Sequence, residues 1–138
     1  MTCTAALLTL GRMPPFVSTS AIVVVKERIL VVMDPILNEP ILPGGHLKWA
    51  ENPETAIIRE VHEETGYRIS PNRLVGVFAG QEWSGEPGVV RLVYEAAITG
   101  GSLASSSEGR AAWMRLEQLV KSDSRDAQLV RSWFDRSP

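Results

Sequence analysis

Two apolar runs near the start of the chain predict a pair of buried strands. The first covers residues 18–25 (STSAIVVV), the second covers residues 29–33 (ILVVM), and the polar residues Lys26, Glu27 and Arg28 between them predict a turn. Neither run alternates between apolar and polar positions, so both faces of these strands should be covered. Helices on both sides of a sheet would cover them, which predicts an α/β fold.

Residues 53–65 carry the signals of an amphipathic helix with defined ends. Asn52 is the expected N-cap, Pro53 suits the first helical position, and Gly66 is placed to end the helix. On a helical wheel one arc holds Ile57, Ile58, Val61 and Thr65. The neighbouring arc holds Ala56, Glu60, Glu63 and Glu64. The first arc is expected to pack on the sheet and the second to face a ligand.

The second half of the chain predicts three further strands, at residues 74–79, 89–98 and 111–115. In 89–98 the even positions are apolar, while Arg91 and Glu95 share the other face, which should be solvent or the wall of a cleft. Residues 116–120 predict a short helical turn. A last helix is expected at about 123–134, docked on the sheet by residues at helical spacing, namely Leu129, Val130, Trp133 and Phe134.

Length and charge narrow the class of protein. With 138 residues and 44% hydrophobic content, the chain fits one domain over residues 1–138, with 1–15 as an N-terminal arm or edge strand. The apolar stretch in that arm is too short to span a membrane and lacks the charges of a secretory signal. A formal charge of −2 argues against a nucleic-acid partner. The single Cys3 implies no disulfide, so a cytoplasmic location is expected.

The carboxylates of Glu60, Glu63 and Glu64 predict a metal site. Their spacings of three and four make them neighbours on a helix, where each like-charged pair costs on the order of 3 kcal/mol at an effective dielectric near 20. A solvated acidic helix face is the alternative. Against it, the acidic arc adjoins the apolar arc and follows Gly44-Gly45, a turn suited to close ligand approach. Oxygen donors favour a hard cation, Mg²⁺ first and Mn²⁺ second.

The stretch 45–67 (GHLKWAENPETAIIREVHEETGY) resembles the signature of the Nudix (MutT-type) hydrolases. The charged and glycine positions of that signature are all present, while Tyr67 stands where the family more often has an aliphatic residue. The flanking order of strands extends the likeness over most of the domain. The resemblance implies a Nudix-type α/β/α sandwich, with a mixed β-sheet, the Nudix-box helix on one face and a C-terminal helix on the other.

The resemblance also implies an activity. Relatives hydrolyse a nucleoside diphosphate linked to another group by water attack on phosphorus, so this chain would be a Mg²⁺-dependent pyrophosphohydrolase. A modified nucleoside triphosphate is one candidate substrate; ADP-ribose, a nucleotide sugar or a dinucleoside polyphosphate is the alternative. A domain that senses a nucleotide without cleaving it is a further hypothesis. The partner in each case is a small nucleotide, and the oligomeric state stays open, a homodimer included.

Roles follow by position in the signature. Glu60 and Glu64 would be metal ligands, with Glu63 a further ligand or the general base. Arg59 would orient a carboxylate of the set through charge-assisted hydrogen bonds, with Glu51 as its partner across the turn.

Further candidates lie outside the helix or at its entry. Gly45 would bind a metal or phosphate through its backbone. A distal metal ligand would be Glu108, with Glu95 as its rival. Arg91 is a candidate for substrate binding. Aromatic rings that could stack on a base or sugar, or simply pack, are those of Phe16, Phe78 and Trp83.

Overall fold

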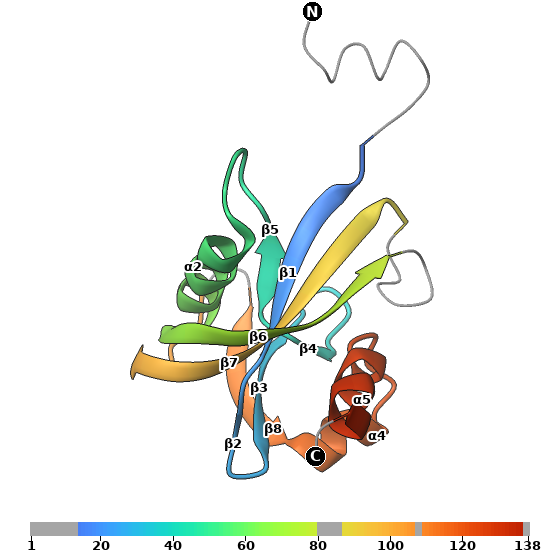
Figure 1. Cartoon of the computed structure of the whole chain (residues 1–138). Coiled ribbons are helices and arrows are strands. Elements are labelled where there is room, and N and C mark those ends of the chain that lie inside the picture. Colours follow the sequence, from blue (N-terminus) through green and yellow to red (C-terminus); the bar gives the residue numbers. More distant parts are fainter. Residues whose placement is uncertain (1–13, 80–86, 107–108, 137–138) are drawn as a thin grey trace, which may run out of the picture.

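The computed structural model describes residues 14–79, 87–106 and 109–136, which form helices and a mixed set of strands (Figure 1). The predicted α/β class is confirmed. In chain order the elements are β1 (Phe16–Ile22), β2 (Val24–Val25), β3 (Arg28–Met33), β4 (Pro40–Ile41), β5 (Gly44–His46), α2 (Pro53–Thr65), β6 (Tyr67–Ala79), β7 (Val89–Gly101), β8 (Arg110–Arg115), α4 (Leu116–Lys121) and α5 (Ala127–Arg136).

Among the described residues the strands form two sheets. The first has the order β5-β1-β7-β6, with β1 and β7 parallel and the other pairs antiparallel. In the second, β2, β4 and β8 all pair antiparallel with β3. The predicted mixed sheet is therefore confirmed, and the structure adds a division in two. The chain crosses from the first sheet to the second at Val23, and crosses back between β4 and β5.

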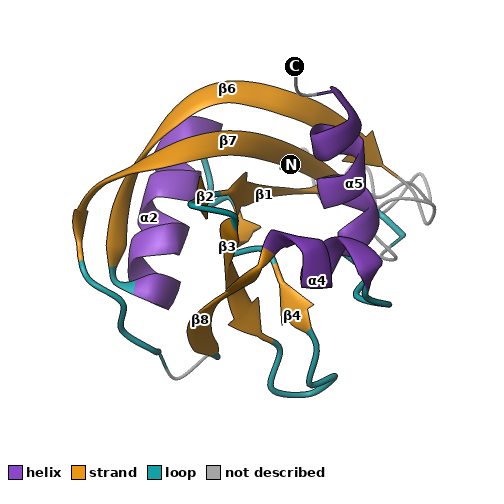
Figure 2. Ribbon diagram, turned by 90° about the horizontal axis from the view of Figure 1, so that it is seen from below, coloured by secondary structure: helices purple, strands orange, loops and turns teal. Residues whose placement is uncertain are grey.

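Helices cover both sides of the central strands, with α2 on one side and α4 and α5 on the other (Figure 2). Successive residues of β1 and β3 enter opposite cores. The core beneath α2 includes Ala21, Leu30 and Ile57, whereas the core beneath α4 and α5 includes Ile22 and Ile29. Because both faces of these strands are buried, their sequence does not alternate.

The ends of α2 are as predicted. The Asn52 side chain accepts a hydrogen bond from the Glu54 N–H at 2.8 Å, and Gly66 ends the helix in a left-handed conformation with φ of 82°. The predicted arcs need one correction, because Ile58 is exposed while Glu64 is buried. The helix packs against β6 and also against β5, so its buried surface is centred between the two arcs.

The second face of β7 was predicted to meet solvent or to line a cleft, and its residues lie in more than one environment. Arg91 lines a cleft, whereas Val93 is fully buried beneath the C-terminal helices. The carboxylate of Glu95 accepts hydrogen bonds from Trp133 of α5 at 2.7 Å and from Arg73 at 2.9 Å. The predicted docking of Phe134 is wrong: this residue is exposed, because it follows Trp133 and so points away from the core.

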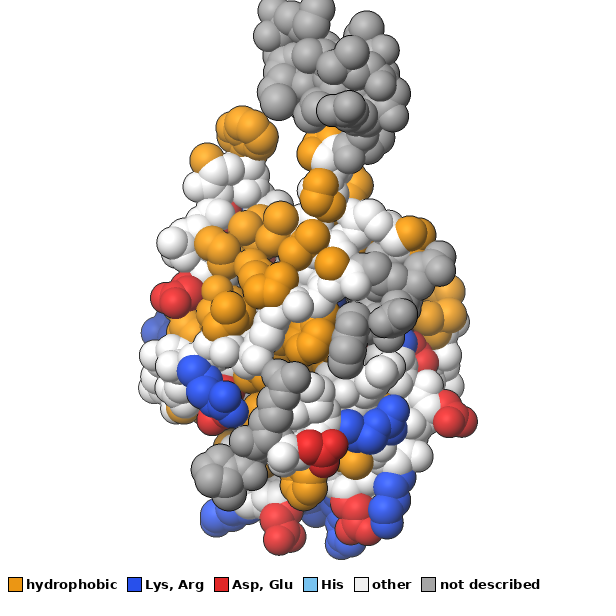
Figure 3. Space-filling view, turned by 45° about the vertical axis from the view of Figure 1, so that its right-hand side comes forward, with side chains coloured by type: hydrophobic (Ala, Val, Ile, Leu, Met, Phe, Trp, Pro, Cys, Tyr) orange, Lys and Arg blue, Asp and Glu red, His pale blue; other side chains and the backbone are white. Residues whose placement is uncertain are grey.

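Several large apolar side chains are exposed on the described part of the chain, and one face gathers apolar side chains above a rim of charged ones (Figure 3). Such surfaces often mark contacts with partners, but association into a homodimer stays a prediction. None of the helices within the described ranges is long and apolar enough to cross a membrane.

Candidate active site

Arg59 holds three carboxylates together on one side of α2. Its Nε and Nη2 donate to the two oxygens of Glu51, both at 2.8 Å, which forms a bidentate ion pair. Its Nη1 donates to Glu60 at 2.8 Å and to Glu63 at 3.2 Å. The predicted pairing of Arg59 with Glu51 across the turn is thus seen directly, and the guanidinium fork is the group suited to it.

The ion pair fixes the charge of both partners. Hydrogen bonds from Arg59, and then from the Lys48 N–H, lower the pKa of Glu51 to about 2. The carboxylates of Glu51 and Glu60 in turn raise the pKa of Arg59 above its usual value. The Glu51–Arg59 pair therefore stays ionised at neutral pH and can serve as a fixed support for Glu60 and Glu63.

Glu60, one of these three carboxylates, and Glu64 meet the backbone of the Gly44-Gly45 turn. The Gly44 N–H donates to Glu64 Oε1 at 2.7 Å. The Glu60 carboxylate lies so close to Gly45 that a Cβ added there would come within 2.6 to 2.8 Å of its atoms. A side chain at position 45 would displace the Glu60 carboxylate from the place that it now occupies. Two consecutive turns of α2 thus direct carboxylates at one short stretch of main chain.

Glu63 differs from its neighbours in exposure. Its side chain is 51% exposed, against 13% for Glu60 and 11% for Glu51. Its ion pair with Arg59, at 3.2 Å, is also the longest of the set. Of the three carboxylates that Arg59 binds, Glu63 is therefore the one most accessible to water.

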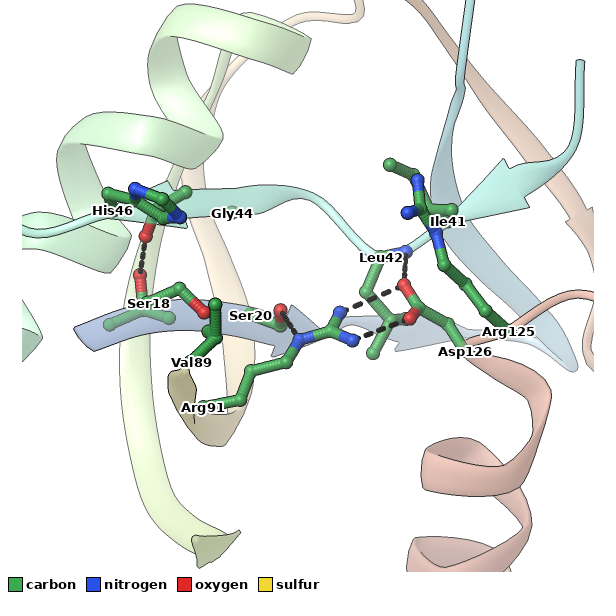
Figure 4. A pocket seen from close by; sticks show the side chains of 12 residues that line it. Ser18, Ser20, Ile41, Leu42, Gly44, His46, Val89, Arg91, Arg125 and Asp126 are labelled. Atoms are coloured by element: carbon green, nitrogen blue, oxygen red, sulfur yellow. Dashed lines mark hydrogen bonds and ion pairs between the residues drawn. The ribbon is translucent and has the colours of Figure 1, made fainter. Parts of the chain in front are cut away.

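A cleft of about 140 Å³ runs from the Gly44-Gly45 turn to the start of α5 (Figure 4). Its walls come from β1, β7, the segment from Ile41 to His46, and the two residues before α5. At one end lie Gly44 and His46, while Arg91, Arg125 and Asp126 lie towards the other. The glycine turn therefore belongs both to the carboxylate cluster and to a cavity that a small molecule can enter.

The donors fit a hard divalent cation in their chemistry. Glu60 and Glu64 supply oxygen donors beside the Gly45 backbone, and the space that a Cβ would fill at Gly45 is taken by a carboxylate. Within the described ranges, no three His, Cys, Asp or Glu side chains already form a ligand cluster. Arg59 instead draws Glu51, Glu60 and Glu63 to itself, and the roles of these residues as metal ligands stay predictions.

The other predicted residues are spread over the structure. Phe16 is exposed and its ring stacks on His46, a cleft residue, with ring centroids 5.4 Å apart. Phe78 is buried in the core beneath α4 and α5, which matches the packing alternative and leaves little ring surface for a ligand. Glu95 is engaged by Arg73 and Trp133. Trp83 and Glu108 lie outside the described residues.

Sequence reasoning named Arg91 as a candidate for substrate binding but missed Asp126, its partner at the far end of the cleft. Asp126 is almost fully buried, and its two oxygens accept hydrogen bonds from Arg91 at 2.6 and 2.9 Å. Ser20 accepts a further bond from Arg91 Nε at 2.9 Å. An Asp just before a helix usually indicates an N-cap, so no local signal distinguished Asp126 from an ordinary helix start.

Comparisons with known proteins agree with this arrangement. The sequence profile of the NUDIX domain matches residues 14–134. A MutT-like protein from Streptomyces ambofaciens is 38% identical over 110 residues, which make up 77% of this chain and 69% of that protein. An ADP-ribose pyrophosphatase from Methanocaldococcus jannaschii is 28% identical over 101 residues, 71% of this chain and 60% of that protein.

Solved structures support the fold in the same way. An ADP-ribose pyrophosphatase from Streptococcus suis superposes with a TM-score of 0.71 at 21% identity, covering 89% of this chain and 93% of that one. At this identity the likeness concerns the course of the backbone, and says nothing about which substrate this chain takes.

Proposed function

The chain belongs to the NUDIX hydrolase family, and we propose that it is a Mg²⁺-dependent pyrophosphohydrolase that cleaves a nucleoside diphosphate linked to another group. One observation carries the proposal: Glu60 and Glu64, one helical turn apart, both meet the Gly44-Gly45 backbone at the end of a cleft. Carboxylates in excess of nearby cations repel a phosphate, so this arrangement is useful for phosphate chemistry only with a metal ion present.

Each residue of the cluster has a separate task in this proposal. Glu60 and Glu64 would hold the ion together with the Gly45 backbone. When bound, Mg²⁺ would supply positive charge that offsets the charge of the diphosphate. Arg59 keeps Glu60 in place and is itself anchored by Glu51. Glu63, the exposed member, would accept the proton of the attacking water at its carboxylate.

The cleft limits how much of the substrate it can enclose. Sites that bury a drug-sized ligand have volumes of about 300 to 1,000 Å³, whereas this cleft measures about 140 Å³. It can therefore take one ring-sized part of a nucleotide, and the remainder would lie outside it. The name of the Methanocaldococcus relative supports ADP-ribose as a candidate alongside a modified nucleoside triphosphate.

A substrate panel tests the proposal. Purified protein would be incubated with modified nucleoside triphosphates, ADP-ribose, a nucleotide sugar and a dinucleoside polyphosphate, each with Mg²⁺ and with excess chelator. We expect a nucleoside monophosphate or an equivalent cleavage product from at least one compound, only in the presence of Mg²⁺. Tight binding of a nucleotide without any product would instead favour a sensing domain.

Thermal stability gives a second test that needs no substrate. A ligand that binds the folded state at ten times its Kd stabilises it by about 1.4 kcal/mol. Mg²⁺ should therefore raise the unfolding midpoint of the wild type by a few degrees. The double variant Glu60→Gln/Glu64→Gln should show no such rise, and an equal rise in this variant would place the ion elsewhere.

A further inference from the structure

Three consecutive residues before α5 fasten the segment that leads into the glycine turn. Ser124 donates its hydroxyl to the Pro40 carbonyl. Arg125 donates to Asp34 at 2.8 Å and lies 3.1 Å from Glu39. Asp126 accepts a hydrogen bond from the Leu42 N–H at 2.7 Å. We call Ser124, Arg125 and Asp126 the clamp; its contacts extend over residues 34–42, almost the whole connection from β3 to β5.

The contact at Leu42 falls where the sheets offer no partner. The chain leaves the second sheet after β4 and joins the first at β5, and Leu42 lies at this passage, 3% exposed. A buried N–H without an acceptor is strongly unfavourable. Asp126, only 1% exposed itself, supplies that acceptor two residues before Gly44.

Arg91 links the clamp to the other side of the glycine turn. Its guanidinium forms two hydrogen bonds with Asp126, and its Nε donates to Ser20 of β1. Ser20 is the strand partner of Gly44 in the pairing of β1 with β5. The turn is thus held through Leu42 before it in the chain and through Ser20 beside it, while Glu64 binds Gly44 itself.

We propose that Asp126 is a positioning residue for the reaction, which acts through Leu42 and Ser20 to hold Gly44 and Gly45 against Glu64 and Glu60. The inference rests on the proposed function, because it takes this turn as part of the active site. A positioning role for Asp126 differs from a role in which the Arg91–Asp126 ion pair only stabilises the fold. A pair that only attached α5 to the sheet could be replaced by apolar side chains of similar size without loss of activity.

Two double variants separate these roles. Arg91→Met/Asp126→Asn and Arg91→Met/Asp126→Leu both remove the buried ion pair, but only the Asn variant keeps an oxygen for the Leu42 N–H. We expect the Asn variant to retain kcat within about threefold of Arg91→Met, and the Leu variant to lose about tenfold or more, with little change in KM. Equal kcat values in the two double variants would overturn the proposal.

Amide exchange reports on the turn without any substrate. The Gly44 N–H donates to Glu64, so its exchange rate should rise by about tenfold or more in the Leu variant and stay near the wild-type rate in the Asn variant. If the wild type cleaves nothing in the panel, the proposed function fails, while this measurement still decides whether the clamp holds the turn. Unchanged exchange in a folded Leu variant would show that it does not.

Two single variants complete the design. Ser124→Ala removes the hydroxyl that donates to the Pro40 carbonyl and accepts from the Asp126 N–H at 3.2 Å, but it keeps both charged side chains of the ion pair, so it remains informative should the Leu variant not fold. It should accelerate Gly44 exchange by less than the Leu variant does, and no acceleration at all would count against the clamp. Glu117→Gln is the matched control, because it breaks an exposed ion pair with Lys121 on α4; it should leave both exchange and kcat unchanged.

Discussion

Two clusters of charged side chains flank the glycine turn, and their charge balance differs. On α2 and at its entry, the carboxylates of Glu51, Glu60 and Glu63 share the single guanidinium of Arg59, and Glu64 adds a fourth carboxylate nearby. At the start of α5, Asp126 and Arg91 form a pair of opposite charges whose hydrogen bonds continue into the backbone. The first cluster has excess negative charge, whereas the second is neutral.

This difference in charge balance separates the two roles that we propose. The first cluster would bind a cation for the reaction, and the second would hold neighbouring elements in place. An excess of like charges at the end of a cleft is unfavourable unless a cation joins it, which is why we propose a cation there. A buried pair with opposite charges needs no further partner and holds elements in place. If this distinction is correct, removing Glu63 or Glu64 from the first cluster should impair activity while the fold survives, whereas removing a charge from the second cluster should have its largest effect on stability.

The largest effect is expected from Asp126→Ala. This change leaves the Arg91 guanidinium, whose side chain is 13% exposed, without its counter-charge and the Leu42 N–H without its acceptor. Breaking a buried ion pair in this way costs about 3 to 5 kcal/mol. The free energy of unfolding from urea titrations should fall by that amount. A loss below about 1 kcal/mol would place the pair with ordinary surface salt bridges.

The second-largest effect is expected on the turnover number, kcat. Glu63→Gln or Glu64→Gln removes a charge from the acidic cluster, and kcat should fall by about a hundredfold or more, the loss typical of a general base or an electrostatic group. The fold should survive, because the excess of negative charge is reduced. Circular dichroism and steady-state kinetics on the best substrate of the panel would measure both. Near-normal kcat in both variants would remove these residues from the site.

The two clusters also differ in how far the sequence reveals them. The α2 cluster lies within residues 51–64: the helical period brings Glu60, Glu63 and Glu64 together, while the pairing of Glu51 with Arg59 across the turn is what the resemblance to the Nudix signature implies. Asp126 binds Arg91 and Leu42, which lie 35 and 84 positions away, and Arg91 binds Ser20, 71 positions away. The geometry of these contacts depends on the parallel pairing of β1 with β7 and on the docking of α5, neither of which leaves a local pattern.

The fold, too, is predictable from the sequence where its signals are local and not where they depend on distant residues. Strands whose two faces are both buried, and a helix with an N-cap and a terminal glycine, are predictable because each signal is local. The overlap of the two arcs on α2, and the exposure of Phe134, depend on which elements pack on which side. Tyr67, the departure from the family signature, has a partner of this nonlocal kind: its hydroxyl accepts a hydrogen bond from Trp113 at 3.1 Å.

The smallest effect is expected when the pH is lowered. It tests how much the Glu51–Arg59 ion pair of the α2 cluster stabilises the fold. The pKa of Glu51 is lowered from 4.5 to about 2, so the ion pair with Arg59 stabilises the fold fully above pH 4.5 and progressively less as the pH falls towards 2. Glu51→Gln lacks this contribution, so its urea midpoint should be below that of the wild type at pH 7. The difference should narrow between pH 4.5 and 3. A constant difference over this range would mean that the stabilisation by Glu51 does not depend on its charge.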